Sequence, residues 1–232
     1  MSPVAIPSLI VARVVDQEES EKLASTRQRL KAEKKQQIVE ATLETVAEHG
    51  VRGATTTQIA KRVGLTHPAL YAYFPSRRAI LLAALDTVFE RIYALHMMSD
   101  TEDAVERLRK VMRYHNSALV PSEELGNVIQ RRIQFVVAPP SEGLAEAMKA
   151  HELRAARQIA DMIELGKRQG TIKQSVDSDK AAWMFVGCIW AEDTAFLADI
   201  ELFRDQDVSF SLAELLLDSI LVHNGGTADS EG

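Results

Sequence analysis

The sequence predicts an all-α protein of two helical domains, and three observations lead to this prediction. Apolar residues recur at helical spacing (i, i+3, i+4, i+7) along most of the 232 residues. No useful length of sequence alternates apolar and polar residues as a half-buried strand does. Glycines and prolines stand between the helical segments, where helices are expected to end. The composition, 46% hydrophobic and 26% charged, is that of an ordinary globular protein.

The first expected helix runs from about residue 25 to residue 48. Val39, Leu43 and Val46 fall on one of its faces. Gly50 ends this helix, because glycine readily takes the positive φ of a helix C-terminus. Residues 1–25 contain two prolines and turn acidic. We expect most of them to form a disordered extension, although their short apolar run could pack locally.

Two short helices are expected next, over the sequences QIAKRV and HPALYAYF. Thr55, Thr56 and Thr57 offer N-cap hydroxyls for the first of them. Gly64 supplies the positive φ that a three-residue turn needs, and Thr66 can cap the second helix. This succession predicts a helix-turn-helix over residues 55–74.

The second helix of this unit has a buried side and a free side. At ~100° per residue, Leu70 and Phe74 lie on the buried side. Tyr71 and Tyr73 fall on its flanks, and small residues such as Ala69 point outward. This arrangement suits a recognition helix whose tyrosines contact phosphates. Half-buried packing is the alternative role for the two tyrosines.

The charge is unevenly distributed along the chain. The net charge is -6, but residues 26–80 carry ten Lys or Arg against four Glu, whereas residues 81–232 carry a net charge of -10. A basic N-terminal part on an acidic body indicates a surface for a polyanion such as DNA. The single cysteine, Cys188, excludes a disulfide framework.

The remainder of the chain is also expected to be helical. Pro75-Ser76 starts a helix that runs to about residue 98, and further helices are expected near residues 102–119, 123–137, 141–169, 178–199 and 207–223. The small and polar residues 224–232 are expected to be a disordered tail. The longest apolar run, residues 181–191, is too short to cross a bilayer, and the start of the chain is a poor signal peptide. We therefore expect no membrane partner.

Residues 32–92 resemble the DNA-binding domain of the TetR family of bacterial transcriptional regulators. The resemblance rests on IVEATLETVAEHGVRGATTTQIAKRVGLTHPALYAYFPSRRAILLAAL, which follows the family pattern without a gap. His67-Pro68-Ala69 departs from the commoner Lys-Gly-Thr type of sequence, so the resemblance does not predict the operator. It implies a DNA-binding domain over residues 26–92, a regulatory and dimerisation domain over residues 93–223, and a homodimer in the bacterial cytoplasm, associated with the nucleoid.

We expect this protein to be a ligand-responsive repressor that binds a palindromic DNA operator. The predicted phosphate contacts come from Thr56, Thr57, Lys61, Tyr71, Tyr73 and Arg77, with Arg78 adding charge. The predicted base contacts come from Thr57, Gln58, His67, Pro68 and Ala69, next to the capping Thr66. Lys34 and Lys35, preceded by Arg27 and Arg29, are expected to form an arm along the backbone or in a minor groove.

Two further sites are expected in the C-terminal domain. A largely apolar effector pocket is predicted from Met112, His115, Phe135, Met148, His151, Met162 and Trp183. A dimer interface is predicted from Trp190, Leu212, Leu215, Leu216, Leu217 and Ile220, because residues 207–223 are apolar on more than one face.

Other classes of function are less well supported. None of the six histidines has a glutamate three residues before it, which argues against a carboxylate-bridged metal bundle. The sequence also lacks His-Glu-x-x-His, Gly-x-Ser-x-Gly and a phosphate-binding glycine loop. We therefore expect no catalytic residues, metal or cofactor. A constitutive DNA-binding or adaptor protein without a sensing pocket remains the alternative.

Overall fold

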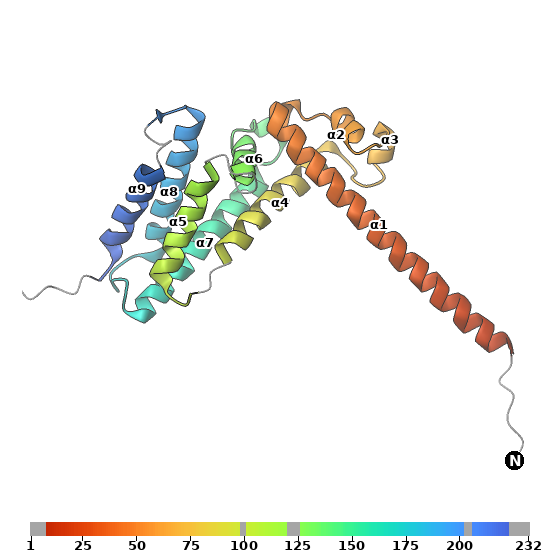
Figure 1. The fold of residues 1–232 in the computed structure, drawn as a ribbon, viewed down its shortest axis with the longest axis horizontal. Coiled ribbons are helices and arrows are strands. Elements are labelled where there is room, and N and C mark those ends of the chain that lie inside the picture. The colour runs from red at the N-terminus through yellow and green to blue at the C-terminus, as the bar shows by residue number, and fades with distance from the viewer. Residues whose placement is uncertain (1–7, 98–100, 120–125, 202–205, 223–232) are drawn as a thin grey trace, which may run out of the picture.

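The protein is a bundle of helices, seen in a computed structural model that describes residues 8–97, 101–119, 126–201 and 206–222 (Figure 1). The α-helices are α1 (Ser8–Gly53), α2 (Thr56–Arg62), α3 (His67–Leu70), α4 (Arg77–Met97), α5 (Ala104–Leu119), α6 (Gly126–Val136), α7 (Ala145–Gln169), α8 (Ser178–Leu197) and α9 (Gln206–Ile220). A 3-10 helix, η1 (Pro140–Glu142), precedes α7. The described residues form no strand, only an isolated bridge between Ile172 and Leu221. The all-α prediction is confirmed.

Two hydrophobic cores hold these helices together. The first joins α1–α4 and includes Phe135 of α6 and Leu144, which precedes α7. The second lies among α5, α7, α8 and α9. Because α4 packs against α1, α6 and α7, it connects the N-terminal helices to the body. The expected domain boundary after residue 92 falls inside α4.

Helix α1 differs most from the sequence-based expectation. It begins at Ser8, whereas we expected residues 1–25 to be disordered. No glycine or proline occurs between Pro7 and Gly50, so nothing in this segment interrupts a helix once it has formed. Gly50 has the expected positive φ, 67°, and breaks the helical geometry there. Residues 1–7 and 223–232, including the whole of the expected tail, lie outside the described residues.

The helix-turn-helix forms largely as predicted, but its second helix is shorter. Helix α3 ends at Leu70, and residues 71–73 form a turn. There the amides of Tyr71, Ala72 and Tyr73 each donate to the carbonyl three residues earlier. This i−3 pattern is tighter than an α-helix and leads the chain into Pro75 before α4.

None of the described helices is both long and apolar enough to cross a membrane.

Candidate nucleic-acid interface and effector pocket

Helix α2 starts at a capping box. The Thr55 hydroxyl accepts a hydrogen bond from the Gln58 amide (3.3 Å), and the Gln58 side-chain oxygen accepts one from the Thr55 amide (3.0 Å). Each side chain satisfies a backbone donor that lacks an intrahelical partner. This arrangement sets the start of α2 and leaves the Gln58 side chain exposed on the surface.

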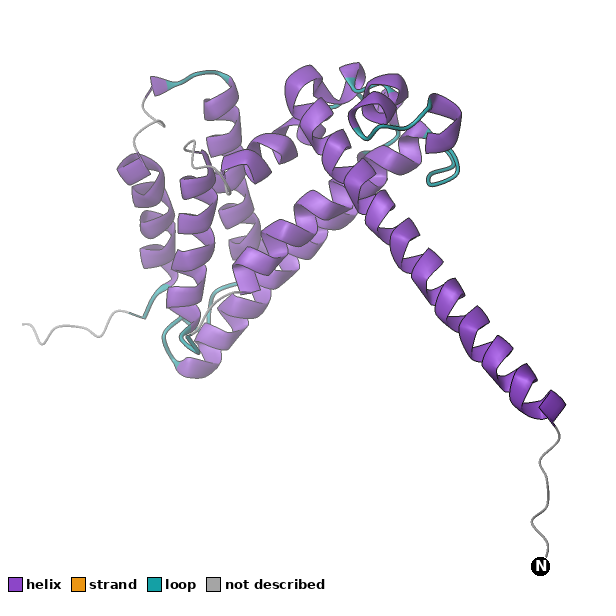
Figure 2. Cartoon of the chain, turned by 45° about the vertical axis from the view of Figure 1, so that its right-hand side comes forward, coloured by secondary structure: helices purple, strands orange, loops and turns teal. Residues whose placement is uncertain are grey.

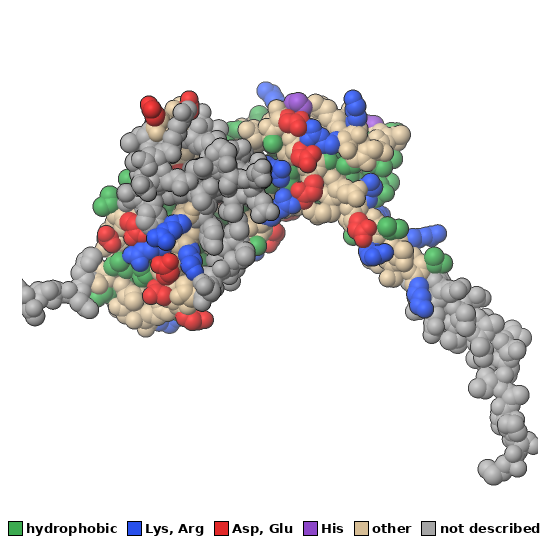
Figure 3. Space-filling view, in the orientation of Figure 1, with side chains coloured by type: hydrophobic (Ala, Val, Ile, Leu, Met, Phe, Trp, Pro, Cys, Tyr) green, Lys and Arg blue, Asp and Glu red, His purple; other side chains and the backbone are tan. Residues whose placement is uncertain are grey.

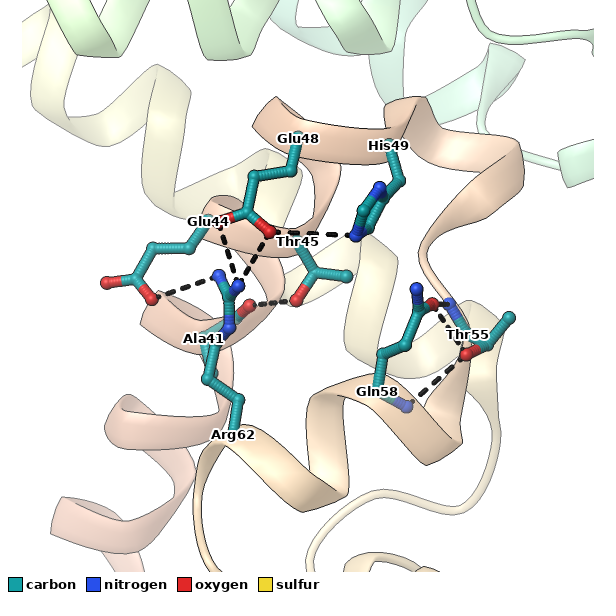
Figure 4. Close-up of polar contacts among 8 residues, drawn as sticks. All are labelled: Ala41, Glu44, Thr45, Glu48, His49, Thr55, Gln58 and Arg62. Atoms are coloured by element: carbon teal, nitrogen blue, oxygen red, sulfur yellow. Dashed lines mark hydrogen bonds and ion pairs between the residues drawn. The ribbon is translucent and has the colours of Figure 1, made fainter.

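Arg62, at the end of α2, fixes this helix to α1. Its guanidinium donates to Glu44 (3.2 Å) and to both oxygens of Glu48 (2.6 and 2.8 Å), as Figure 4 shows. The hydrogen bond from Arg62 is the largest effect on Glu48 and holds the pKa of that carboxyl below its usual range. Sequence reasoning missed this clamp, because Arg62 was counted only as part of the basic region.

The turn and α3 present a small exposed surface. Gly64 has a φ of 68° in the turn, and the Thr66 hydroxyl accepts from the Ala69 amide (3.3 Å) as the cap of α3. Leu70 anchors α3 in the first core. His67 and Pro68 are exposed, so their side chains are free to meet a partner.

Most of the predicted DNA-contacting residues lie at the surface. The exposed ones are Lys35, Thr57, Gln58, Lys61, Thr66, His67, Pro68, Tyr71 and Arg78, and the partly exposed ones are Lys34, Ala69, Tyr73 and Arg77. Thr56 is different: only 9% of it is exposed. Its hydroxyl lies 2.9 Å from Nε2 of His67, so it supports α3 from behind and is not placed to contact a phosphate.

Arg77 is also not free to contact DNA. Its Nε donates to the Ala54 carbonyl (2.9 Å), and its two terminal nitrogens bond the Val51 carbonyl and the Glu142 carboxylate. Each of the three guanidinium nitrogens therefore donates a hydrogen bond within the subunit. This arrangement corrects the predicted phosphate contact, because Arg77 instead joins the α1–α2 turn to η1.

Arg78 forms a weaker contact with the same loop. Its Nε donates to the Gly143 carbonyl (3.0 Å). Gly143 has a φ of 70°, and a Cβ built on it would lie 2.9 Å from Nε of Arg78. Glycine thus allows both the backbone conformation and the close approach of the arginine.

A cavity of about 300 Å³ lies between α6, η1, α7 and α8. Its lining consists of Phe135, Val136, Ala138, Pro139, Pro140, Leu144, Ala145, Met148, Glu152 and Trp190. Of the seven residues predicted for the effector site, the cavity brings together Phe135 and Met148. The other five predicted residues do not line this cavity, because helical periodicity cannot separate residues that line a cavity from residues that fill a core.

The other predicted pocket residues have different environments. Met112 and Met162 are buried in the second core, and Trp183 is exposed on α8. His151 lies between α7 and α4, where its Nε2 is 2.9 Å from Asp86 and its ring stacks on Phe89. The side chain of the seventh residue, at position 115, lies outside the described part of the structure.

A buried charged network borders one end of the cavity. Arg132 bonds the carboxylates of Asp193 and Glu152, the latter at 3.0 Å. Burial alone lowers the pKa of Arg132, but the two carboxylates outweigh this effect and raise it. The Trp190 indole donates to the other Glu152 oxygen (3.3 Å). The cavity therefore has an apolar body and one polar end.

Helices α8 and α9 carry an apolar face that their own subunit leaves uncovered. They lie side by side at the end of the molecule opposite α3 (Figure 1). Exposed residues on them are Trp183, Met184, Trp190, Leu212 and Leu215. Leu216, Leu217 and Ile220 were also predicted at the interface, but they are buried in the second core of the subunit. Of the five predicted interface residues on α9, Leu212 and Leu215 are therefore exposed, and the other three pack inside the subunit.

The described residues contain no group of three His, Cys, Asp or Glu side chains that could hold a metal ion.

Comparison with known proteins agrees with this architecture. The family model described as "Bacterial regulatory proteins, tetR family" matches residues 38–84. A fatty acid metabolism regulator protein from Bacillus subtilis (strain 168) is 27% identical over 197 residues, which cover 84% of this chain and 98% of that protein. The HTH-type transcriptional repressor KstR from Rhodococcus jostii (strain RHA1) is 25% identical over 56% of this chain and 61% of its own length.

The fold is likewise found among solved structures. SmeT, the repressor of the Stenotrophomonas maltophilia multidrug efflux pump SmeDEF, superposes with a TM-score of 0.68 at 20% identity, covering 85% of this chain and 97% of that one. The capped helix-turn-helix and the family match over these residues lead to one assignment: residues 38–84 form a DNA-binding domain of the TetR family of bacterial transcriptional regulators.

Proposed function

We propose that this chain is a homodimeric repressor that binds a palindromic operator and releases it when a small, largely apolar molecule enters the α6–α8 cavity. The TetR-family match over residues 38–84 and the regulators among its relatives support a DNA-binding transcriptional regulator rather than an enzyme. The observation that carries the proposal is that one loop both lines the cavity and holds an arginine beside the helix-turn-helix. Pro139 and Pro140 line the cavity, and Glu142 in the same loop holds Arg77.

The DNA-contacting surface in this proposal is smaller than the predicted one. His67, Pro68 and Ala69 at the start of α3 are short or polar and reach base edges in the major groove. Phosphate contacts come from Thr57, Gln58, Lys61, Tyr71, Tyr73 and Lys35 around them. Thr56 and Arg77 act inside the subunit instead, by holding α3 and the α1–α2 turn in position.

Dimerisation uses the exposed face of α8 and α9. Trp190, Leu212 and Leu215 are large apolar residues at the surface, and Gly187 has nothing within 4 Å of a built Cβ. A two-fold axis through this face would pack two helices from each subunit together. The two α3 helices would then lie one DNA turn apart, ~34 Å, which requires a palindromic operator. In this proposal the dimer binds operators on the bacterial chromosome, in the cytoplasm.

Effector binding would act by shifting the population of subunit arrangements. A molecule in the cavity presses on Pro139 and Pro140 at one end of the loop that carries Glu142. Movement of that loop is passed to Arg77, and so to the turn before α2. The apolar lining favours an apolar molecule. Fatty acids, whose metabolism gives the Bacillus subtilis relative its name, belong to this class. The cavity therefore favours a ligand-responsive repressor over a constitutive DNA-binding protein.

A ligand screen with a cavity-filling variant tests the proposal. A cognate compound should raise the melting temperature and weaken operator binding together, because both effects follow from preferential binding to one state. Met148→Trp should abolish both effects by occupying the cavity. Leu153→Trp is the matched control, since Leu153 is exposed on the same helix. A compound whose effects survive Met148→Trp would place the effector site elsewhere.

A further inference from the structure

The N-terminal half of α1 projects away from the rest of the molecule in both views (Figures 1 and 2). The described side chains from Ser25 to Glu33 are all exposed, and Ile38 is the first residue of α1 in a core. A helix that packs against nothing is only marginally stable in water. This segment therefore has a surface that suits a partner outside the subunit.

The cations of this segment divide into two sets. At ~100° per residue, Arg27, Lys31 and Lys34 fall within an arc of about 60° on one face of α1. In the described part of the chain these three cations form no ion pair. Arg29 lies on the opposite face and pairs with Glu33 (3.8 Å). Only the first set is available to an external anion.

The face with the unpaired cations also adjoins the recognition helix. Arg27, Leu30, Lys31 and Lys34 form one wall of a groove of about 470 Å³. Ala72 and Tyr73, directly after α3, form the other wall. Figure 3 shows Lys and Arg side chains (blue) following the projecting part of α1 from the helix-turn-helix outward. The groove is thus a basic channel that continues from the DNA-reading surface.

We propose that the Arg27–Lys31–Lys34 face binds the DNA backbone just outside the base pairs read by α3. This inference rests on the proposed DNA-binding function and adds a second contact region to it. From Lys34 to Arg27 the helix rises ~10 Å, about three base pairs of duplex at ~3.4 Å each. A helix ~10 Å across is too wide to lie in a minor groove of ~6 Å, and the three exposed cations are complementary in charge to phosphates, so we assign the contact to the DNA backbone. Of the two placements considered from the sequence, along the backbone or in a minor groove, this inference selects the first and assigns it to Arg27, Lys31 and Lys34.

The experiment uses a DNA duplex selected by the full-length wild-type protein from a random-sequence pool. One version ends at the edges of the selected palindrome, and another carries eight extra base pairs of unrelated sequence on each side. Affinity for both is measured against salt concentration, for the wild type, for Arg27→Gln/Lys31→Gln and for Arg29→Gln. All substituted residues are exposed, and circular dichroism checks that each variant keeps its helix content.

Wild-type protein should bind the long duplex more tightly than the short one. The double variant should lose this preference, and its slope of log affinity against log salt on the long duplex should become shallower by ~3.6. This value is ~0.9 for each of four phosphate contacts in the dimer. Arg29→Gln should resemble the wild type, although it also removes positive charge, one per subunit against two in the double variant.

Three results would overturn the inference. Equal wild-type affinity for both duplexes would remove the flanking contact and leave the proposed function intact. Equal slopes for the double variant and the wild type would show that these cations serve another partner, such as an acidic protein. A selection in which the wild-type protein enriches no duplex from the pool would overturn the proposed function together with the inference.

Discussion

The substitution Arg77→Ala separates two roles for an arginine at the start of α4. The side chain is 30% exposed, and the carboxylate that it holds, Glu142, is 13% exposed. Its other acceptors are the carbonyls of Val51 and Ala54, two residues buried in the first core. If Arg77 joins these elements, its loss leaves three acceptors without their donor. If it contacts DNA, its loss affects only the complex.

The magnitude follows from these contacts. A hydrogen bond to a charged group contributes ~1.5–3 kcal/mol to stability, and bonds that share one guanidinium are not additive. We therefore expect Arg77→Ala to lower the free energy of unfolding by ~3 kcal/mol. In a chain of this size that corresponds to a fall in melting temperature of ~6–12 °C. Arg78→Ala, which removes one exposed contact with Gly143, should change stability by no more than ~0.5 kcal/mol.

Two assays decide between the roles. Urea unfolding gives the change in stability, and DNA binding at several salt concentrations gives the number of phosphate contacts. We expect Arg77→Ala to be destabilised and, once folded, to keep the wild-type salt slope. A variant with unchanged stability and a slope shallower by ~0.9 per subunit would refute the reasoning and return Arg77 to the DNA surface.

Three further predictions concern other parts of the molecule. Leu215→Arg should split the dimer while each subunit stays folded, because Leu215 is 67% exposed on the proposed interface. Leu217→Arg should instead unfold the subunit, since Leu217 is 1% exposed and an unpaired cation is costly to bury. Sedimentation measures the first effect and circular dichroism the second, and a Leu215→Arg variant that stays dimeric would exclude this face. Arg132→Met should lower the free energy of unfolding by ~3–5 kcal/mol, because it removes the buried guanidinium that bonds the carboxylates of Asp193 and Glu152, and urea unfolding at wild-type values would contradict this. Because Arg62 lowers the pKa of Glu48, the stabilisation from their contact should be complete above the ordinary glutamate pKa and should disappear as pH falls through the lowered pKa. In Glu48→Gln the free energy of unfolding should therefore fall less steeply as the solution is acidified. The same pH dependence in the variant and the wild type would argue against this contribution.

Local chemistry explains why much of the fold was predictable. Helix ends depend on caps and breakers that can be recognised in the sequence: Thr55 and Thr66 cap α2 and α3 as predicted. Gly64 and Gly170 have the positive φ expected of residues that end helices. The core positions Leu70 and Phe74 follow directly from helical periodicity.

The errors share a physical origin, since each depends on contacts between distant parts of the chain. Arg77 stands 65 residues before Glu142, and no local pattern indicates that the two meet. Leu216 lies on a helix with two apolar faces, and its burial depends on which face meets α5 and α8. The cavity is likewise formed by side chains from four elements. The long α1 was missed because an acidic composition was given more weight than the absence of helix-breaking residues.

The central claim is that two copies of this chain read a palindrome through α3, and one measurement tests it most directly. Genomic fragments bound by the wild-type protein are selected and sequenced, in parallel with fragments bound by a His67→Ala/Ala69→Gly variant, whose substitutions lie at the exposed start of α3. The account predicts a wild-type motif of two inverted half-sites with centres ~10 base pairs apart, and altered preference at positions inside each half-site for the variant. Enrichment of a non-palindromic motif, or an identical motif for both proteins, would contradict it.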